Sequence, residues 1–184
     1  MDRSTISNCR QQDELNAWLL AELRSDHAGE TGAVCIYQGI LAVSRDPRVR
    51  EFASTHLATE QEHLELISAV IADKKRSIFT PMWRLAGFLT GAIPALFGPS
   101  AVFATIDAVE TFVDMHYQQQ IDRLRAADQQ PEIVALLERC REDEIKHRDE
   151  ARSLITRRPV LVLRVWCWLV GSGSATAVKL ARWR

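Results

Sequence analysis

Cysteine is scarce in this 184-residue sequence, which contains only Cys9, Cys35, Cys140 and Cys167. No two of them form a CxxC pair, and their spacing fits no disulfide framework. This argues against a zinc ribbon or a rubredoxin-type iron site and favours a reducing compartment. The first 15 residues are polar and lack the apolar core of a signal peptide, so we expect no export.

Glycine and proline are also few, with eight Gly and six Pro that gather mainly around residues 80–100 and 171–173. No stretch alternates between apolar and polar residues as a half-buried strand does. The sequence therefore predicts an all-α protein of one domain, 1–184, in which residues 1–12 are flexible. We expect four long helices and two shorter apolar ones; they cover about 13–44, 47–75, 78–98, 99–127, 131–155 and 159–182.

Acidic residues are absent from 151–184, although the whole chain has 24 Asp and Glu and a net charge of −1. This end carries seven Lys and Arg, so its charge is +7 and that of residues 1–150 is −8. Three of the five Trp also lie there. Basic residues mixed with Trp suit an anionic membrane surface. The acidic body argues against nucleic acid as a partner. The alternative is a basic C-terminal helix packed on an acidic body.

An uninterrupted apolar run of membrane-spanning length is missing as well. Residues 85–106 form 22 positions without a charge, but Pro94 and the pair Gly98-Pro99 break the run. Because a broken helix leaves backbone groups unpaired in lipid, a helix lying in the interface is favoured over a span. We predict membrane-associating helices at 78–98 and 160–184 and a peripheral membrane protein.

What the sequence does contain is one Glu on the apolar stripe of each long helix: Glu30, Glu60, Glu110 and Glu144. Isolated carboxylates in a core are unfavourable, so four of them together require something strongly positive to neutralise them. Two of these Glu are followed three residues later by a histidine, His63 and His147. Positions i and i+3 share a helix face, so each pair can hold one metal ion.

The order Glu, ExxH, Glu, ExxH is the pattern of ferritin-like di-iron bundles. Glu30 and Glu110 are 80 residues apart and Glu60 and Glu144 are 84 apart, as a repeated helix pair would give. Carboxylate-rich sites suit iron or manganese better than zinc or copper. In this interpretation Glu30 and Glu110 bridge or cap the metal pair. A purely structural bundle is the alternative.

Several segments carry a resemblance to the demethoxyubiquinone hydroxylase (Coq7/Cat5) family. They are RSDHAGETGA (24–33), EQEH (60–63), TPMWRLAGFLTGA (80–92), VE (109–110), HYQQQI (116–121) and DEIKHRDE (143–150). The resemblance covers roughly residues 20–184. Many members of the family have a second His where this sequence has Met115.

The resemblance implies a ferritin-like di-iron monooxygenase that uses O₂ to hydroxylate the ring of a polyprenyl benzoquinone in ubiquinone synthesis. It implies two iron ions per chain, held by Glu30, Glu60, His63, Glu110, Glu144 and His147. It also implies reduced nicotinamide (NADH) as the electron source and apolar helices that dip into the membrane. Other ubiquinone-biosynthesis proteins and a second copy of the chain are the protein partners that the family suggests.

Five polar residues lie near this expected ligand set. Tyr117 follows Glu110 by two turns; it either gates protons or electrons or touches the quinone, or it is a core tyrosine with a bonded hydroxyl. The resemblance suggests a substrate or electron role for His116. His27 and His56 precede Glu30 and Glu60 by one turn and either hold the ligands in place or are ordinary buried histidines. Asp143 either orients a ligating histidine on another helix or is a solvated acid.

A polyprenyl quinone leaves a bilayer only at a high free-energy cost, because each CH₂ group buried in lipid contributes about 0.8 kcal/mol. We therefore expect the site to open toward the lipid through a channel walled by residues 79–97, the start of the third long helix and the last helix. The helical phase of 79–97 is ambiguous, so two pairs are candidates; the wall residues are Leu85 and Phe88, or Leu89 and Phe97, together with Phe103.

Two other classes of function remain open. One is a different ferritin-like di-metal protein, namely iron storage, a peroxidase or a manganese catalase. The other is a non-enzymatic membrane- or lipid-binding bundle, which leaves the four core Glu unexplained. Because the N-terminus lacks a mitochondrial targeting pattern, we expect the cytoplasmic face of a bacterial inner membrane.

Overall fold

The computed structural model describes residues 3–156 and 160–183, without the side chains of residues 3–12 and 14. The described residues form six α-helices and one 3₁₀ turn and contain no strand, so the all-α prediction is confirmed. The helices are α1 (Arg3–Val43), α2 (Pro47–Val70), α3 (Thr80–Ala95), α4 (Pro99–Ala126), α5 (Pro131–Ser153) and α6 (Leu161–Trp183), with η1 (Asp73–Lys75) after α2.

Most helix starts agree with the sequence, and two boundaries differ. Proline occupies the first turn of α2, α4 and α5. An N–H group in the first turn has no acceptor within the helix, so the absence of this group in proline costs no helical hydrogen bond. The start of α1 near residue 13 was wrong: the helix begins at Arg3, since no Gly or Pro interrupts the chain before Gly29. The end of α2 near residue 75 was also wrong, because the backbone is extended at Ile71 and a separate turn follows.

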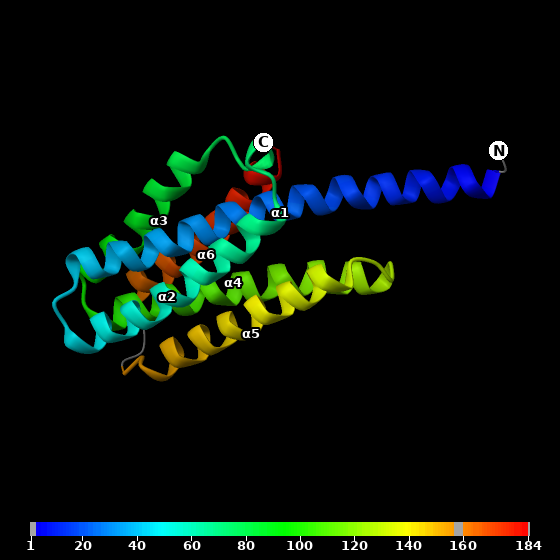
Figure 1. Ribbon diagram of the computed structural model, residues 1–184. Helices are drawn as coiled ribbons and strands as arrows, with labels where there is room; N and C mark the ends of the chain where they lie inside the picture. The colour runs from blue at the N-terminus through cyan, green and yellow to red at the C-terminus, as the bar shows by residue number, and fades with distance from the viewer. Residues whose placement is uncertain (1–2, 157–159, 184) are drawn as a thin grey trace.

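Helices α1 and α2 form one antiparallel pair and α4 and α5 another, and the two pairs enclose the interior (Figure 1). Two apolar clusters fill the ends of this interior. One includes Leu19, Ile67 and Leu137, and the other includes Ile40 and Phe103. The polar side chains described below lie between these clusters, so an apolar shell closes the centre at both ends.

Helix α3 packs on α1 with the two backbones in direct contact. A Cβ atom on Gly91 would lie 1.9 Å from the carbonyl oxygen of Ile36, and one on Gly87 would lie 2.3 Å from that of Gly32. Gly87 and Gly91 are one helical turn apart, so together they give α3 a smooth edge with no side chain. This edge determines which face of α3 points toward the body of the protein.

Helix α6 lies against α1 and α4 on the same side of the molecule as α3 (Figure 1). The indole nitrogen of Trp166 donates to the hydroxyl of Thr105 on α4 at 2.9 Å. Near the other end, the Arg182 guanidinium donates to the Glu22 carboxylate on α1 at 2.8 Å. These contacts attach both ends of α6 to the body.

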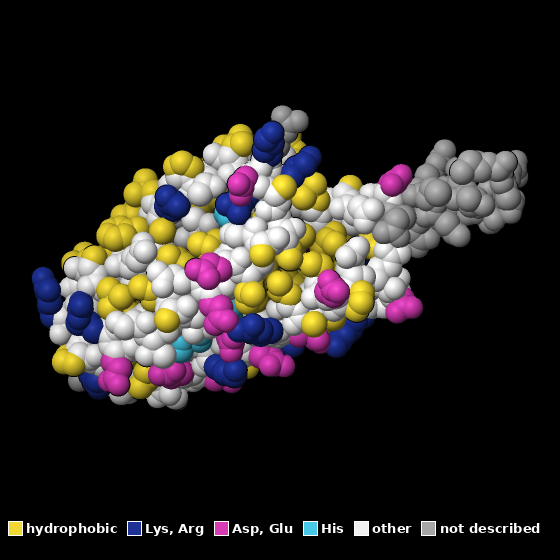
Figure 2. Space-filling model, viewed as in Figure 1, with side chains coloured by type: hydrophobic (Ala, Val, Ile, Leu, Met, Phe, Trp, Pro, Cys, Tyr) yellow, Lys and Arg dark blue, Asp and Glu magenta, His cyan; other side chains and the backbone are white. Residues whose placement is uncertain are grey.

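Both α3 and α6 expose apolar side chains. Leu85 is 61% exposed and Trp168 is 67% exposed, and hydrophobic groups gather over α3 in Figure 2. Among the described helices, α6 is the one long and apolar enough to cross a membrane, and none of its most apolar stretch is buried. Exposed apolar area of this kind indicates a surface that contacts another apolar phase.

Candidate metal centre

Six acidic and imidazole side chains converge in the middle of the bundle, and at most 3% of each residue is exposed. They are the six residues that the sequence singles out: Glu30, Glu60, His63, Glu110, Glu144 and His147. Their potential ligand atoms fall into two groups, each within 4.8 Å: Glu30, Glu60, His63 and Glu144, and Glu60, Glu110, Glu144 and His147. Glu60 and Glu144 belong to both groups. The structure could therefore hold two ions that share these two carboxylates.

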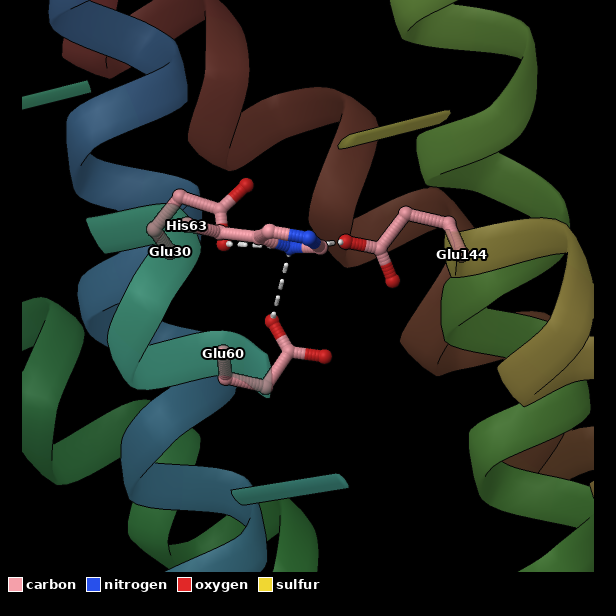
Figure 3. Close-up of side chains that lie close together, drawn as sticks. All are labelled: Glu30, Glu60, His63 and Glu144. Atoms are coloured by element: carbon pink, nitrogen blue, oxygen red, sulfur yellow. Dashed lines mark hydrogen bonds and ion pairs between the residues drawn. The ribbon is translucent and has the colours of Figure 1, made fainter. Parts of the chain in front are cut away.

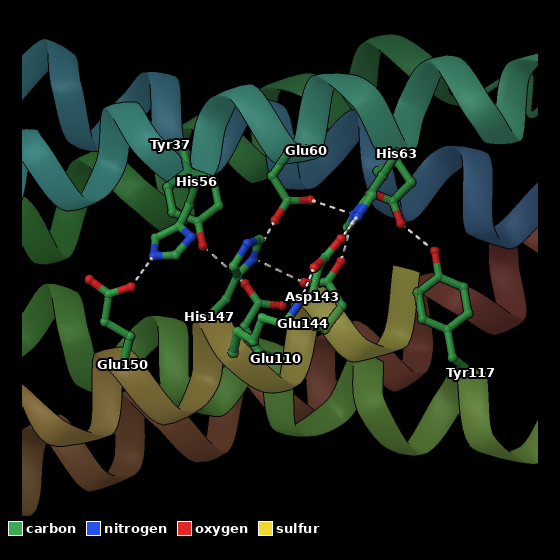
Figure 4. A network of polar contacts seen from close by, with 12 residues as sticks. Tyr37, His56, Glu60, His63, Glu110, Tyr117, Asp143, Glu144, His147 and Glu150 are labelled. Atoms are coloured by element: carbon green, nitrogen blue, oxygen red, sulfur yellow. Dashed lines mark hydrogen bonds and ion pairs between the residues drawn. The ribbon is translucent and has the colours of Figure 1, made fainter. Parts of the chain in front are cut away.

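The two ExxH helices face each other across the centre. The Nδ1 atom of His63 on α2 lies 3.1 Å from Oε1 of Glu144 on α5, and Nδ1 of His147 on α5 lies 3.1 Å from Oε1 of Glu60 on α2 (Figures 3 and 4). Each histidine thus contacts the shared carboxylate of the opposite helix.

Several buried atoms of this cluster lack a hydrogen-bond partner among the described residues. They are Glu30 Oε2, both carboxylate oxygens of Glu60, Glu144 Oε2 and His147 Nδ1; the last lies within ion-pair distance of Glu60 Oε1 (3.1 Å) and Glu144 Oε2 (3.3 Å) but forms a hydrogen bond with neither. A buried polar atom without a partner is unfavourable, and native structures contain few of them. A bound cation would satisfy these atoms, and a set of four carboxylates with two imidazoles suits iron or manganese.

The ionisation of the cluster supports the same conclusion. Burial raises the pKa of Glu30 and Glu110 well above the ordinary carboxyl value, and the neighbouring carboxylates raise both further. Burial acts to lower the pKa of the two histidines, but Glu144 and the other acids outweigh it and raise the pKa of His63 to about 10 and that of His147 to about 9. Two imidazolium charges thus face four carboxyl groups, so the cluster without a metal ion retains protons that a metal would displace.

Two tyrosines bind the terminal carboxylates in a reciprocal arrangement. The hydroxyl of Tyr117 on α4 donates to Glu30 on α1, and the hydroxyl of Tyr37 on α1 donates to Glu110 on α4 at 3.3 Å (Figure 4). Burial raises the pKa of both phenols well above the usual value, so both remain neutral donors. Each tyrosine follows the Glu of its own helix by seven residues, which places the two on one face of that helix.

Asp143 and His56 also contact the cluster. Asp143 Oδ2 lies 3.3 Å from His63 Nε2, so it reaches from α5 to a histidine on α2. His56 does not bind a carboxylate of the cluster; its Nε2 pairs with Glu150 at 3.0 Å, and its ring packs against that of His147 with centroids 4.0 Å apart. His56 therefore touches His147 only by ring contact.

His116 and His27 lie in different surroundings. His116 Nε2 is 3.1 Å from Asp26 Oδ1, and Gln120 donates to the same oxygen at 2.8 Å. His27 shares no hydrogen bond with any of the six cluster residues among the described contacts, and it lines a separate cavity on another face of α1. The sequence groups His27 with Glu30 on one stripe, but the structure separates the surroundings of the two.

A cavity of about 630 Å³ leads from the surface to Glu30, Glu60, Glu110 and Glu144. Its inner end includes Tyr117 and His116, and its walls come from α1, α3, α4 and α6. The walls are mostly apolar; those from α3 are Met82, Trp83, Ala86, Gly87 and Thr90. The cavity thus combines an apolar passage with a polar end at the carboxylates.

The wall residues named from the sequence are not among those that line this cavity. Leu85, Phe88, Leu89 and Phe97 are exposed, and Phe103 is 2% exposed within an apolar cluster. For Leu85, Phe88 and Leu89 the reason is the close contact through Gly87 and Gly91, which turns the opposite side of α3 outward. Phe97 lies beyond the end of α3, and Phe103 packs in the apolar cluster on α4. Helix α4 contributes Val109 and Val113 to the wall in place of Phe103.

Sequence reasoning missed three residues of the site. Tyr37 was given no role, although its spacing from Glu30 repeats that of Tyr117 from Glu110. Asp26 and Gln120 were not singled out, and neither spacing nor composition distinguishes them from surface residues. The contact of Asp26 with His116 depends on how α1 packs against α4, whereas Gln120 lies one turn after His116 on α4 itself.

Comparisons with known proteins agree with the geometry. The family model described as "Ubiquinone biosynthesis protein COQ7" matches residues 17–181. The chain is 40% identical over 130 residues to 3-demethoxyubiquinol 3-hydroxylase of Rhodospirillum rubrum; the match covers 69% of this chain and 60% of that protein. It is 37% identical over 132 residues to the mitochondrial NADPH-dependent 3-demethoxyubiquinone 3-hydroxylase of Dictyostelium discoideum, covering 68% and 59%.

A third relative, 3-demethoxyubiquinol 3-hydroxylase of Azoarcus sp., is 30% identical over 154 residues, or 83% of this chain and 74% of that protein. The chain thus spans about three fifths of the length of the first two relatives and three quarters of the third.

Proposed function

Because this chain belongs to the COQ7 family of ubiquinone biosynthesis proteins, we propose that it is a ferritin-like di-iron monooxygenase that hydroxylates the ring of a demethoxyubiquinol-type polyprenyl quinone. The observation that carries the proposal is the cavity, because an apolar passage of about 630 Å³ ends at four buried carboxylates. Iron storage or a catalase reaction needs no passage of this kind, since their substrates are small and polar.

The buried oxygens without partners fit two iron ions. In this proposal Glu30 and His63 would hold one ion and Glu110 and His147 the other, while Glu60 and Glu144, which belong to both ligand groups, would contribute to both. When bound, the metal pair supplies the reduction of O₂ for the hydroxylation. Asp143 orients His63 through its contact with Nε2.

The remaining residues of the cavity bind and orient the substrate. The ring approaches the centre beside Tyr117 and His116, while the isoprenoid tail follows the apolar walls that α3 and α6 provide. The apolar walls exclude water from the reacting ring. The Tyr117 hydroxyl holds its proton at the Glu30 carboxylate, at the end of the cavity where the ring arrives.

The electron donor in this proposal is a reduced nicotinamide nucleotide. The resemblance implies NADH, whereas the name of the Dictyostelium relative specifies NADPH, so both nucleotides need to be compared. Partnership with other ubiquinone-biosynthesis proteins and self-association stay predictions.

We further propose peripheral attachment to the membrane through residues 78–98 and 160–184. Exposed side chains such as Leu85, Phe88 and Trp168 support it, and the contacts of Trp166 and Arg182 with the body favour an α6 that lies on the surface over one that spans. The Dictyostelium relative is named as mitochondrial; for this chain we propose the cytoplasmic face of a bacterial inner membrane.

The experiment that tests the function is expression in a bacterial strain that lacks its quinone ring hydroxylases, followed by mass spectrometry of the lipid extract. We expect the demethoxy intermediate to be replaced by the hydroxylated product, and we expect Glu144→Ala to leave the intermediate in place. Persistence of the intermediate with well-expressed, iron-loaded protein would contradict the proposal and favour a lipid-binding or storage role.

A further inference from the structure

A second cavity, of about 550 Å³, lies between α1, α2, η1 and α3. On α1 it is lined by His27 and Thr31, whereas the first cavity uses Ser25, Gly29 and Gly32. Successive residues of an α-helix are rotated by 100° about its axis, so His27 is rotated by about 200° from both Ser25 and Gly29 and lies nearly opposite them. The two cavities therefore use different faces of α1. Nothing in the proposed hydroxylation uses this second cavity.

The lining of this cavity is strongly basic. It contains Lys74, Arg76 and Arg84 against one carboxylate, Asp73. Asp73 pairs with Arg76 at 2.9 Å, but its side chain is 85% exposed. Lys74 and Arg84 have no ion-pair or hydrogen-bond partner among the described side chains. Lys and Arg side chains also gather around the connection between α2 and α3 in Figure 2. The cavity therefore attracts anions.

Two buried nitrogen atoms of the residues that line this cavity have no hydrogen-bond partner among the described residues. His27 is 5% exposed, and its Nδ1 atom is buried without a partner, as is Nε of Arg76. Burial, and secondarily the charge of Arg76, lowers the pKa of His27 to about 4, so the ring is neutral and donates one N–H. The Nε of Arg76 always carries a proton, and the neutral His27 ring can carry its single proton on Nδ1. Buried donors without acceptors are rare in folded proteins, which indicates that an acceptor-rich ligand belongs here.

We propose that this second cavity binds a phosphate group, carried either by an anionic phospholipid or by a soluble phosphate compound. A phosphate offers several acceptor oxygens and matches the planar donor pair of an arginine, so Arg76, Arg84 and Lys74 can bind it together. Hydroxyl groups of Ser68 and Thr80 add neutral contacts at the rim.

The cavity also borders the apolar face of α3. Ile78 lines it and is 69% exposed, and Phe79 and Met82, 37% and 44% exposed, follow along the chain. A phospholipid could place its head group among the cations and its chains against these residues, whereas a soluble phosphate would use the cavity alone. The test must therefore separate the two sources.

The first arm measures binding of inorganic phosphate to the full chain by isothermal titration. We expect Lys74→Gln and Arg84→Gln each to weaken binding by about tenfold, because each removes a charge-assisted hydrogen bond. The matched control is Lys75→Gln, which removes the same charge from the neighbouring residue that does not line the cavity. His27→Phe removes the unpartnered ring nitrogen Nδ1 and should also weaken binding, with little change in thermal stability.

The second arm measures sedimentation with vesicles of phosphatidylglycerol in phosphatidylcholine. If Lys74→Gln and Arg84→Gln weaken vesicle binding several-fold more than Lys75→Gln does, the phosphate is that of a lipid head group. If those variants lose only the binding of inorganic phosphate, the ligand is soluble. Equal behaviour of Lys74→Gln and Lys75→Gln in both arms, or no binding of either probe, would overturn the proposal. Neither arm requires iron or turnover, so the outcome is independent of the proposed hydroxylase activity.

Discussion

The Tyr117 hydroxyl on α4 donates a hydrogen bond to the Glu30 carboxylate on α1, at the inner end of the larger cavity. Tyr37 makes the corresponding contact with Glu110, but it is fully buried and does not line the cavity. The two halves of the centre thus use the same residue types, and both Glu30 and Glu110 line the cavity, but of the two tyrosines only Tyr117 does. A comparison of variants at Tyr117 and Tyr37 can therefore separate an effect on turnover from an effect on stability.

We expect Tyr117→Phe to lower turnover by roughly tenfold or more, because a hydrogen bond to a charged group contributes about 1.5–3 kcal/mol. Tyr37→Phe removes a comparable bond away from the cavity, so it should lower thermal stability and largely preserve turnover. Steady-state kinetics and thermal unfolding of both iron-loaded variants provide the check. Equal loss of turnover in the two would refute the special role of Tyr117.

Removing a shared carboxylate should affect metal binding more than removing a terminal one. Glu144 belongs to both ligand groups and Glu30 to one. We therefore expect Glu144→Ala to lose nearly all iron and activity, and Glu30→Ala to retain about half of the iron. Iron per chain is measured by elemental analysis. Full iron occupancy and turnover in Glu144→Ala would show that the ligand assignment is wrong.

Metal affinity should increase with pH. In the metal-free centre the pKa values of His63 and His147 are raised to about 10 and about 9, so both rings are protonated at neutral pH. A metal ion binds neutral imidazole, so metal binding releases these protons. Because a higher pH favours proton release, the metal affinity should rise from about pH 6 to about pH 8. Chelator competition at several pH values measures the slope. An affinity that is constant or that falls over this range would contradict the ionisation described here.

A methyl group on Gly91 should weaken the docking of α3. The added Cβ would lie 1.9 Å from the Ile36 carbonyl oxygen, so Gly91→Ala should destabilise the fold by about 1–3 kcal/mol. Gly171 in α6 has nothing within 4 Å of an added Cβ, so Gly171→Ala should be neutral or stabilising by up to about 1 kcal/mol. Denaturant unfolding compares the two. Similar stability of both variants would mean that α1 and α3 do not meet through their backbones.

Adjacent residues on α3 should have different functions. Ala86 lines the cavity, while Leu85 is 61% exposed and does not line it. Ala86→Asp should raise the KM for a long-tailed quinone and spare a short-tailed analogue, whereas Leu85→Asp should weaken vesicle binding and leave the KM for the short analogue unchanged. Iron content serves as the control for folding in both. If Leu85→Asp alone raised the KM for the long substrate, the entrance would lie on the outer face of α3.

The sequence alone determined the helical class and the six residues that converge in the candidate metal centre. Both depend on a local signal, because a Glu on an apolar stripe with a 3.6-residue period must be buried when the helix packs. The Pro at the start of α2, α4 and α5 is equally local, since the proline ring predisposes the backbone to a first helical turn.

Only the tertiary structure decided which carboxylates are shared, which face of α3 lines the cavity and which histidines touch the centre. The spacing allowed Glu30 and Glu110 to bridge or to cap, and the packing of α2 against α5 instead places Glu60 and Glu144 between both groups. Helix α3 is apolar almost all round, so its hydrophobic pattern has no phase, and the backbone contact at Gly87 and Gly91 sets its rotation. His27 lies three residues before Glu30 and His56 four before Glu60, about one turn in each case, yet only His56 meets the ring of His147, because that contact depends on the neighbouring helix.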